Sequence, residues 1–331
     1  MRKLYYIFIF ILFNSACSSN HLLGYKSPVK IGTASFSGAY YPTGGALSKI
    51  ANKYLEKDFS KVVSSKGSSD NINNIMSNQV HIGLAQADRH YEAYYGLEEW
   101  KDKGPQTKLR SIFSLYSQTI NLIATKSSGI KSLKDLKGRR INLGGKGSGE
   151  LGNALDILKT LELNPKTDIK ASYHHVSKML RYFEKGYLDA FFYTIGYPSL
   201  VLTKAASYQS ARQISIIGVD GFLIKNPYYQ TVLISNDAYP AMIKDGHRIE
   251  SIGVMTTLVT SSDIPESVIY KFTKAIFEHL EELRTQHSVL SKLDKLDMLK
   301  GLTAPLHPGA LRYFKEAGLF DEYDPIKRLF D

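Results

Sequence analysis

Short apolar runs alternate along most of the chain with segments whose apolar residues recur every three or four positions. The runs predict strands, at residues 29–33, 62–63, 81–86, 140–143, 169–176 and 188–193. The periodic segments predict helices, at residues 43–57, 151–161 and 179–185, with a further helix that Asp70 caps after the second strand. Strands that alternate with helices in this way predict an α/β fold, with parallel strands joined by right-handed crossovers.

Extended segments interrupt this alternation twice. Residues 111–126 form one long apolar stretch, which predicts a strand that leaves one unit of the fold and enters another. Residues 231–235 and 254–259 predict strands that return. A long amphipathic helix at 265–284 and a last helix at 311–317 then complete the first unit.

The length of the chain fits this division. Its 331 residues are 43% hydrophobic, which is enough to fill two cores. We predict a two-lobed clamshell with two extended hinge crossings, in which residues 28–116 and 232–331 form lobe I and residues 117–231 form lobe II. The loops at the strand ends of the two lobes would face a common cleft.

Residues 1–20 have the composition of an export signal: a basic start at Arg2 and Lys3, a short apolar middle and small residues at the end. The apolar part is shorter than a membrane span. Cys17, the single cysteine, follows Ser15-Ala16 as the lipidated cysteine of a bacterial lipoprotein does, although Asn14 departs from that pattern. An ordinary leader that is removed with its cysteine is the alternative. We expect a periplasmic or extracytoplasmic protein whose contact with the membrane is at most a lipid anchor.

The net charge of the chain limits the classes of partner that it favours. Lys and Arg exceed Asp and Glu by 11, which favours anionic partners. The basic residues are dispersed without a stripe, so nucleic acid is not an expected partner. The nine histidines are scattered, and no spacing of them predicts a metal site. We expect no cofactor.

The junction after the first strand carries the clearest chemistry. The strand ends at Thr33, and small or hydroxylated residues, Ser35, Ser37 and Gly38 among them, lead into a helix. Free backbone N–H groups at such a helix start suit an anion, and the hydroxyl groups add hydrogen bonds. The alternative is an ordinary tight turn of an α/β protein, with Tyr40 packed in the core.

A second junction of this kind follows the strand at 140–143. The amides of Gly147, Ser148 and Gly149 would hold a polar group there, and Lys146 would neutralise a ligand carboxylate or lie on the surface. Glu150 would pair with Lys146 or receive a ligand amine. Two such junctions predict a ligand with two polar ends.

Two further strand ends have polar residues at the expected cleft. Gln86 ends one strand, and Tyr193, Gly196 and Tyr197 follow another. We expect these residues to close the sides of the site, with surface or core packing as the alternative.

The segment 147–152 also has the spacing G-x-G-x-x-G of a dinucleotide-binding loop. That fold requires an acidic residue near the end of the next strand, where this chain has His174-His175-Val176. The segment does not match a phosphate-binding Walker loop either, because that motif requires serine or threonine after its lysine and Lys146 is followed by glycine. Since no residues assemble into a catalytic set, we expect a protein that is not an enzyme. An enzyme that uses a nicotinamide cofactor stays the alternative from another class.

Taken together, several segments resemble one family, the TAXI class of TRAP-transporter solute receptors. The segments are Ile31-Gly32-Thr33, Tyr40-Tyr41-Pro42, Gly44-Gly45-Ala46, residues 83–88, residues 129–138, Gly147-Ser148-Gly149, residues 189–192, Gly196-Tyr197-Pro198 and residues 307–313. They occur in the expected order over nearly the whole chain after the leader.

The resemblance implies a type II periplasmic-binding-protein fold and the capture of a small carboxylate, such as glutamate or 2-oxoglutarate, for the membrane subunits of a TRAP transporter. From the junctions and strand ends described above, we predict that the ligand lies against Thr33, Ala34, Ser35, Ser37, Gly38, Ala39, Tyr40, Gln86, Lys146, Gly147, Ser148, Gly149, Tyr193, Gly196 and Tyr197. Phe36, Lys146 and Glu150 depart from the family pattern and bear on ligand identity. An orphan sensory lipoprotein or a surface antigen without a transporter is the alternative within binding proteins.

Overall fold

A computed structural model describes residues 28–36, 38–197, 199–208, 211–243 and 248–320. The predicted leader, Cys17 and Ser37 lie outside these residues. No helix in the described part of the chain combines the length and the apolar character that crossing a bilayer requires.

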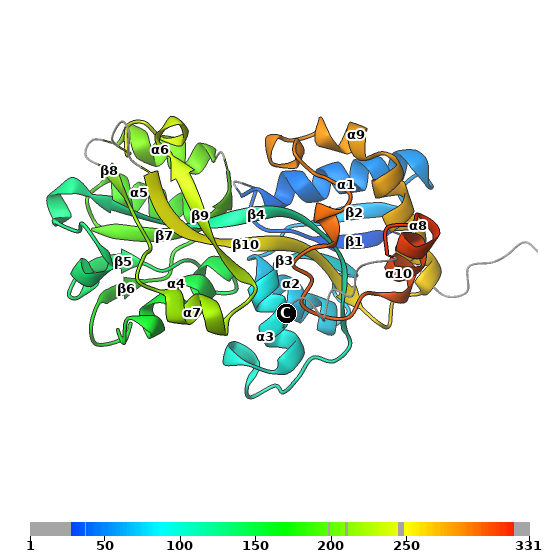
Figure 1. The fold of residues 1–331 in the computed structure, drawn as a ribbon, viewed down its shortest axis with the longest axis horizontal. Helices are drawn as coiled ribbons and strands as arrows, with labels where there is room; N and C mark the ends of the chain where they lie inside the picture. The colour runs from blue at the N-terminus through cyan, green and yellow to red at the C-terminus, as the bar shows by residue number, and fades with distance from the viewer. Residues whose placement is uncertain (1–27, 37, 198, 209–210, 244–247, 321–331) are drawn as a thin grey trace, which may run out of the picture.

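The described residues form one ten-stranded sheet that runs through both lobes (Figure 1). Its order is β2-β1-β3-β10-β4-β7-β5-β6, with β8 paired to β4 and β9 to β10. The bounds are β1 Val29–Gly32, β2 Ser60–Val63, β3 Ile82–Gln86, β4 Leu109–Thr125, β5 Arg140–Asn142, β6 Lys170–Ser172, β7 Ala190–Gly196, β8 Ala211–Ile214, β9 Tyr229–Ser235 and β10 Arg248–Ser261. The pairs β1–β2, β1–β3, β5–β6 and β5–β7 are parallel, as the alternation of strands and helices predicts.

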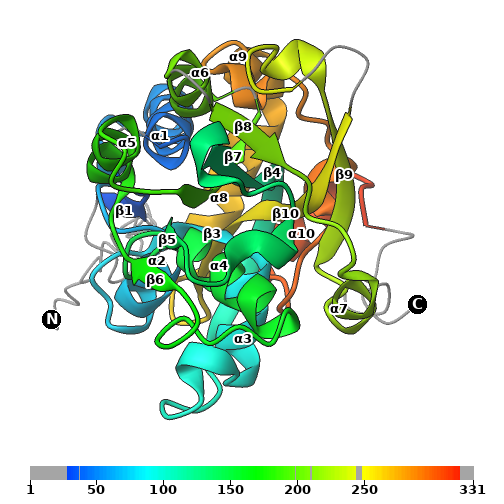
Figure 2. The same ribbon diagram turned by 90° about the vertical axis from the view of Figure 1, so that its left-hand side faces the viewer.

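Helices cover both faces of the sheet, as Figures 1 and 2 show from two sides. The upper layer holds α1 (Tyr40–Tyr54), α5 (Val176–Glu184), α6 (Leu200–Ser207) and α9 (Leu280–Arg284). The lower layer holds α2 (Ser68–Met76), α3 (Ala87–Tyr95), α4 (Gly149–Thr160) and α7 (Asp220–Lys225). At the outer end of the first lobe lie α8 (Glu266–Glu278) and α10 (Pro308–Glu316).

The core of each lobe follows from these apolar patterns. In the first lobe, Leu47 of α1, Phe272 of α8 and Phe314 of α10 are fully buried in one cluster. In the second lobe, Phe191 and Phe192 are neighbours on β7 whose side chains enter different clusters, one with α5 and one with α4. Side chains alternate across a strand, so β7 holds the helices of both layers.

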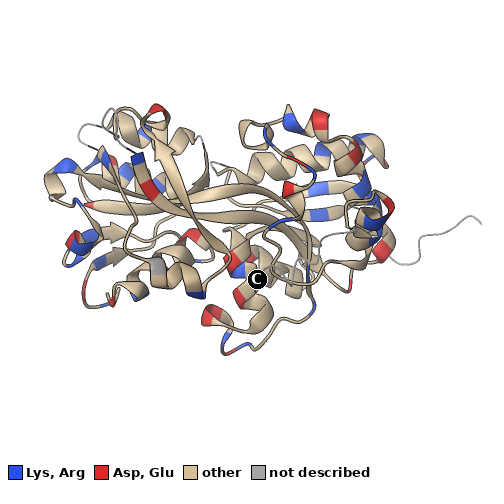
Figure 3. Cartoon of the chain, viewed as in Figure 1, with Lys and Arg blue, Asp and Glu red and all other residues tan. Residues whose placement is uncertain are grey.

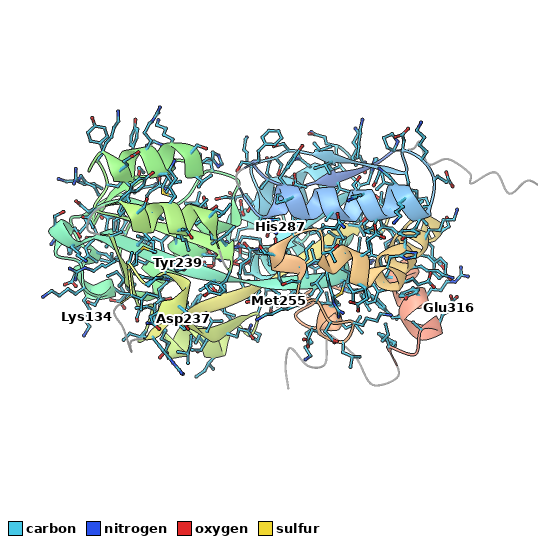
Figure 4. The ribbon with its side chains drawn as sticks, turned by 90° about the horizontal axis from the view of Figure 1, so that it is seen from above. Lys134, Asp237, Tyr239, Met255, His287 and Glu316 are labelled. Carbon is cyan, nitrogen blue, oxygen red and sulfur yellow. The ribbon has the colours of Figure 1, made fainter. Side chains whose placement is uncertain are left out.

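The two crossings are β4 and β10, which pair antiparallel over much of their length. Along β4 the partner changes from β10 to β7 and β8, and along β10 it changes from β9 to β3. The pairing register of β10 shifts between Met255 and Thr257. Figure 4 shows Met255 near this crossing, with Tyr239 in the second lobe and His287 in the first. The crossings are the segments about which the lobes can move relative to each other.

Several predicted boundaries are wrong. The cap of α2 is Gly67, and Asp70 lies inside the first turn, where its Oδ2 accepts a hydrogen bond from Lys66 N at 3.0 Å. The helix predicted at 265–284 is interrupted at His279, and β6 ends at Ser172. The sequence interpretation also missed α3, β8 and α7.

Core packing favours a lobe boundary after residue 232. Ile234, Tyr239 and Met242 pack in the same cluster as Phe191 of the second lobe. Because they share that core, we propose that the chain returns to the first lobe along β10, near Ile252.

A substitution at Gly309 of α10 tests how closely α10 packs on α8. A Cβ at this position would lie 2.3 Å from the carbonyl oxygen of Glu266 and 2.6 Å from the nitrogen of Tyr270, so backbone would meet backbone. We expect Gly309→Ala to lower the free energy of unfolding by about 1–3 kcal/mol. A Cβ added to Gly45 of α1 would meet no atom within 4 Å. We expect Gly45→Ala to raise the free energy of unfolding by about 0.5–1 kcal/mol.

Urea unfolding of the two variants beside the wild type measures both effects. If Gly309→Ala is as stable as the wild type, the close approach of α10 to α8 is not present in solution.

Candidate functional site

A cavity lies between the lobes, where the ends of several elements meet. Its volume is about 70 Å³, which is room for a small molecule and not for a macromolecular segment. Its walls are formed by Ala34, Ser35, Gly38, Ala39, Tyr40, Lys66, Gly67, Ser68, Gln86, Gln118, Ser148, Gly149, Glu150, His175, Val176, Tyr193, Thr194 and Ile195. Both lobes therefore contribute to one site.

Four helices begin at this cavity. Tyr40 opens α1 and Ser68 opens α2 in the first lobe, and Gly149 opens α4 and Val176 opens α5 in the second. All four residues line the cavity. Each helix start carries unpaired N–H groups and the positive end of the helix dipole, so the four together favour a negatively charged group.

Tyr40 joins three elements on the first-lobe side. Its hydroxyl accepts a hydrogen bond from Gln118 Nε2 at 2.8 Å and lies 3.3 Å from the hydroxyl of Ser68. Ser68 Oγ accepts a hydrogen bond from the backbone nitrogen of Gln86 at 3.1 Å. Burial raises the pKa of Tyr40, which stays protonated at neutral pH.

Gln86 is held in one orientation across the lobes. Its Nε2 donates to Asn153 Oδ1 of α4 at 3.1 Å, and the same oxygen accepts from Thr194 Oγ1 at 2.8 Å. Asn153 Nδ2 donates in turn to Asp88 at 2.5 Å, which fixes its amide. Gln86 Oε1 is left buried without a hydrogen-bond partner in the described part of the chain. A buried acceptor in this state is costly unless a ligand or water donates to it.

Glu150 is the acidic residue of the cavity wall. Its Oε1 accepts a hydrogen bond from Gly145 N at 3.3 Å, and it takes part in none of the ion pairs formed by the described residues. Burial raises the pKa of its carboxyl to about 7, against the lowering effect of that bond. The pKa of Tyr193, which faces it on the cavity wall, is raised by burial and by the charge of Glu150.

The structure brings most of the predicted site residues together. Those that line the cavity are Ala34, Ser35, Gly38, Ala39, Tyr40, Gln86, Ser148, Gly149 and Tyr193. Those that do not are Thr33, Lys146, Gly147, Gly196 and Tyr197.

Each absence has a structural reason. The hydroxyl of Thr33 donates to the carbonyl oxygen of Val63 at 2.9 Å, so it ties β1 to β2. Lys146 is exposed, and Gly147 turns its carbonyl oxygen toward Asp70 N of the other lobe. Gly196 packs against Tyr116, and a methyl group there would meet its ring at 3.0 Å. Tyr197 is 47% exposed.

The sequence interpretation missed a third strand-to-helix junction. Residues 63–69 lead from β2 into α2 through small and hydroxylated residues, as the two predicted junctions do, and they place Lys66, Gly67 and Ser68 at the cavity. The same rule would have found them. Gln118 lies inside a long strand and has no such signal. His175, Val176, Thr194 and Ile195 also escaped the prediction.

Glycines let the two lobes touch beside the cavity. A Cβ on Gly67 would lie 3.2 Å from Ser148 Cα, and one on Gly149 would lie 1.8 Å from Gln86 Oε1. Asp70 N donates to the carbonyl oxygen of Gly147 at 3.1 Å across the same contact. The structure is therefore that of a closed cleft.

Behind the cavity, a buried interlobe ion cluster joins α3 to α4 and β9. Arg89 of α3 lies 2.8 Å from Glu92, 2.5 Å from Asp156 of α4 and 3.3 Å from Asp88. Tyr229 of β9 donates to Asp88 at 2.6 Å. Three carboxylates thus share one guanidinium, and burial raises the pKa of both Glu92 and Asp156. Burial of this cluster therefore favours a proton on one of its carboxyl groups.

Basic residues, by contrast, are scattered over both lobes (Figure 3). Among the residues that line the cavity, one carries a basic side chain of this kind, Lys66. The attraction for an anion inside the cleft therefore comes mainly from the helix starts.

Comparison with known proteins agrees with this architecture. The sequence profile of the NMT1-like family matches residues 31–318. Among solved structures, MatC (Rpa3494) from Rhodopseudomonas palustris with bound malate has a TM-score of 0.57 and 14% identity, over 91% of this chain and 97% of that one. A structure described for glutathione import via GshT and the cystine ABC importer TcyBC of Streptococcus mutans has a TM-score of 0.50 and 14% identity, over 83% of this chain and 100% of that one.

These similarities show the fold. It is the two-lobed clamshell of type II periplasmic binding proteins, with two extended crossings, and this confirms the predicted fold class.

The proton of the ion cluster gives the protein a pH-dependent stability. The pKa of Glu92 is higher in the folded chain than its ordinary value of 4.5, so the folded state binds a proton that the unfolded state has released. The free energy of unfolding must then fall as pH rises above that value. We expect this fall between about pH 4.5 and about pH 9, and a smaller one in Glu92→Gln, whose neutral amide mimics the protonated carboxyl.

Thermal unfolding across that range measures the difference, with Glu99→Gln as a control on an adjacent segment. Parallel pH profiles of the wild type and Glu92→Gln would contradict the assignment.

Proposed function

The chain belongs to the NMT1-like family, and on this premise we propose that it is an extracytoplasmic solute-binding receptor that captures a small carboxylate between its lobes. One observation carries the proposal: four helix starts, two from each lobe, meet at a cavity of small-molecule size. Contacts from both lobes exist only when the cleft is closed, so a ligand that makes them stabilises the closed state.

The polar walls support a ligand with two ends. The first lobe offers the starts of α1 and α2 with Tyr40 and Ser68, and the second offers the starts of α4 and α5. A dicarboxylate or an acidic amino acid would place one end at each side. MatC, which shares the fold, was solved with malate, and that ligand class is consistent with the proposal.

The transporter partner rests on the sequence. The segments that resemble TAXI receptors support delivery of the ligand to the membrane subunits of a TRAP transporter. The composition of residues 1–20 supports export to the periplasm or the outer face of the membrane, with Cys17 as the site of a lipid anchor. Genes for the membrane subunits beside this one would strengthen the link, and a gene standing alone would favour an orphan receptor.

Gly149→Ala tests whether closure of the cleft carries binding. The added methyl group would enter the position of Gln86 Oε1 and lie 2.8 Å from Ser68 Oγ, both on the opposite lobe. Alanine suits the start of a helix, so the fold should stay stable. We expect the dissociation constant for a bound carboxylate to rise about tenfold or more, which corresponds to about 1.4 kcal/mol.

Isothermal calorimetry of the purified protein against dicarboxylates and acidic amino acids first identifies a ligand and then compares the variants. Gly45→Ala, which adds the same methyl group in open space on α1, is the matched control. Lys146→Ala should also leave the affinity unchanged, because Lys146 lies outside the cavity wall. If no carboxylate of the panel binds the wild type, the proposed function is wrong.

A further inference from the structure

We infer that Glu150 makes the cavity selective for carboxylates that also carry an amino group, so that amine-free anions of the same length bind more weakly. The inference rests on the proposed function and adds to it a specificity-determining residue. Its basis is that two hydrogen-bond acceptors, Glu150 and Gln86, both line the cavity.

The first acceptor is held in place by the backbone around it. Glu150 is the second residue of α4, and its side chain folds back over Gly144, where a Cβ would lie 2.5 Å from Glu150 Cγ. One oxygen accepts the 3.3 Å hydrogen bond from Gly145 N. A carboxylate can accept several hydrogen bonds, so this contact leaves most of its capacity unused.

No cation of the cavity wall neutralises Glu150. Lys146, four residues earlier, is exposed and lies outside the wall. Lys66 lines the cavity but is exposed, and it forms no ion pair with Glu150 among the described residues. The charge of Glu150 therefore faces the ligand without a basic side chain beside it. A carboxylate so placed attracts an ammonium group and repels a second carboxylate.

The second acceptor lies against the start of the same helix. Gln86 Oε1 would be 1.8 Å from a Cβ on Gly149, the residue before Glu150. Its amide cannot turn over without losing the bond to Asn153 Oδ1, an oxygen that also accepts from Thr194. Gln86 is 2% exposed, and its oxygen has no partner in the described residues. An ammonium group carries three donors and would satisfy this oxygen together with Glu150.

The charge balance of the closed cleft supports the same ligand class. The four helix starts would bind the negative end of the ligand, and the acceptors Glu150 and Gln86 would bind the positive end. Burial raises the pKa of the Glu150 carboxyl to about 7, so this carboxyl is partly protonated at neutral pH. The ammonium group of a ligand would keep it ionised. An amine-free dicarboxylate would instead require Glu150 to bind a proton.

Glu150→Gln separates this role from a structural one. The amide oxygen of glutamine can still accept the bond from Gly145 N, so the loop keeps its brace, but the charge is gone. A purely structural Glu150 would therefore tolerate this change, or lose affinity for all ligands alike. A selective Glu150 would lose the preference for the amino group alone.

The experiment compares ligand pairs that differ only in the amino group: L-glutamate with glutarate, and L-aspartate with succinate. Calorimetry of the wild type should give a dissociation constant about tenfold or more lower for the amino member of the pair that fits, the size of one charged hydrogen bond. In Glu150→Gln the two members should bind within about threefold of each other. Glu162→Gln, at an exposed residue two positions after the end of α4, is the matched control and should keep the wild-type ratio.

The outcomes distinguish the two proposals. Equal binding of both members by the wild type, or an unchanged ratio in Glu150→Gln, overturns the role of Glu150 and leaves the carboxylate receptor standing. Absence of binding by every member of both pairs overturns both.

Discussion

The contact between the two lobes is the constraint on which the site depends. At Gly67 and Gly149 the starts of α2 and α4 approach the opposite lobe so closely that a Cβ on Gly67 would meet the backbone of Ser148, and one on Gly149 the side chains of Gln86 and Ser68. This approach brings helix starts from different lobes around one small volume. Without it, each lobe would present an ordinary strand-to-helix turn to water, where an anion gains little from a single helix start.

The long strands make this contact reversible in principle. β4 and β10 exchange partners where they pass from one lobe to the other, and the register shift near Met255 lies at that place. The buried interlobe ion cluster adds a second contact, behind the cavity. Its three carboxylates and one guanidinium make it a weak source of net stability, because desolvation of the charges opposes their attraction. Contacts from a ligand bound between the lobes would add to the stability of the closed state, as the proposed function requires.

Much of the fold could be predicted from the sequence, because the lobes obey simple periodicities. The alternation at Phe191 and Phe192, the amphipathic α1 and α8, and the two long strands all follow from apolar spacing. The junctions at Ser35 and Ser148 could be predicted as parts of the site, since parallel α/β folds place strand ends at the same edge. Gln118 could not, because its burial comes from the pairing of β4 with β10, which no local pattern reveals. The prediction for Lys146 rests on its charge and its place in the glycine loop, and neither reveals that the side chain is exposed at the surface, the alternative that the sequence leaves open.

The most direct test of the account is the distance between the lobes in solution. Spin labels on cysteines at Lys61 of β2 and Lys178 of α5, both exposed and on different lobes, would report it by pulsed dipolar spectroscopy, with Cys17 replaced by serine. The account predicts a broad distribution for the unliganded protein and a shorter, narrow one when a carboxylate that binds is added. A distribution that does not change on saturation with such a ligand would contradict the closure of the lobes around it.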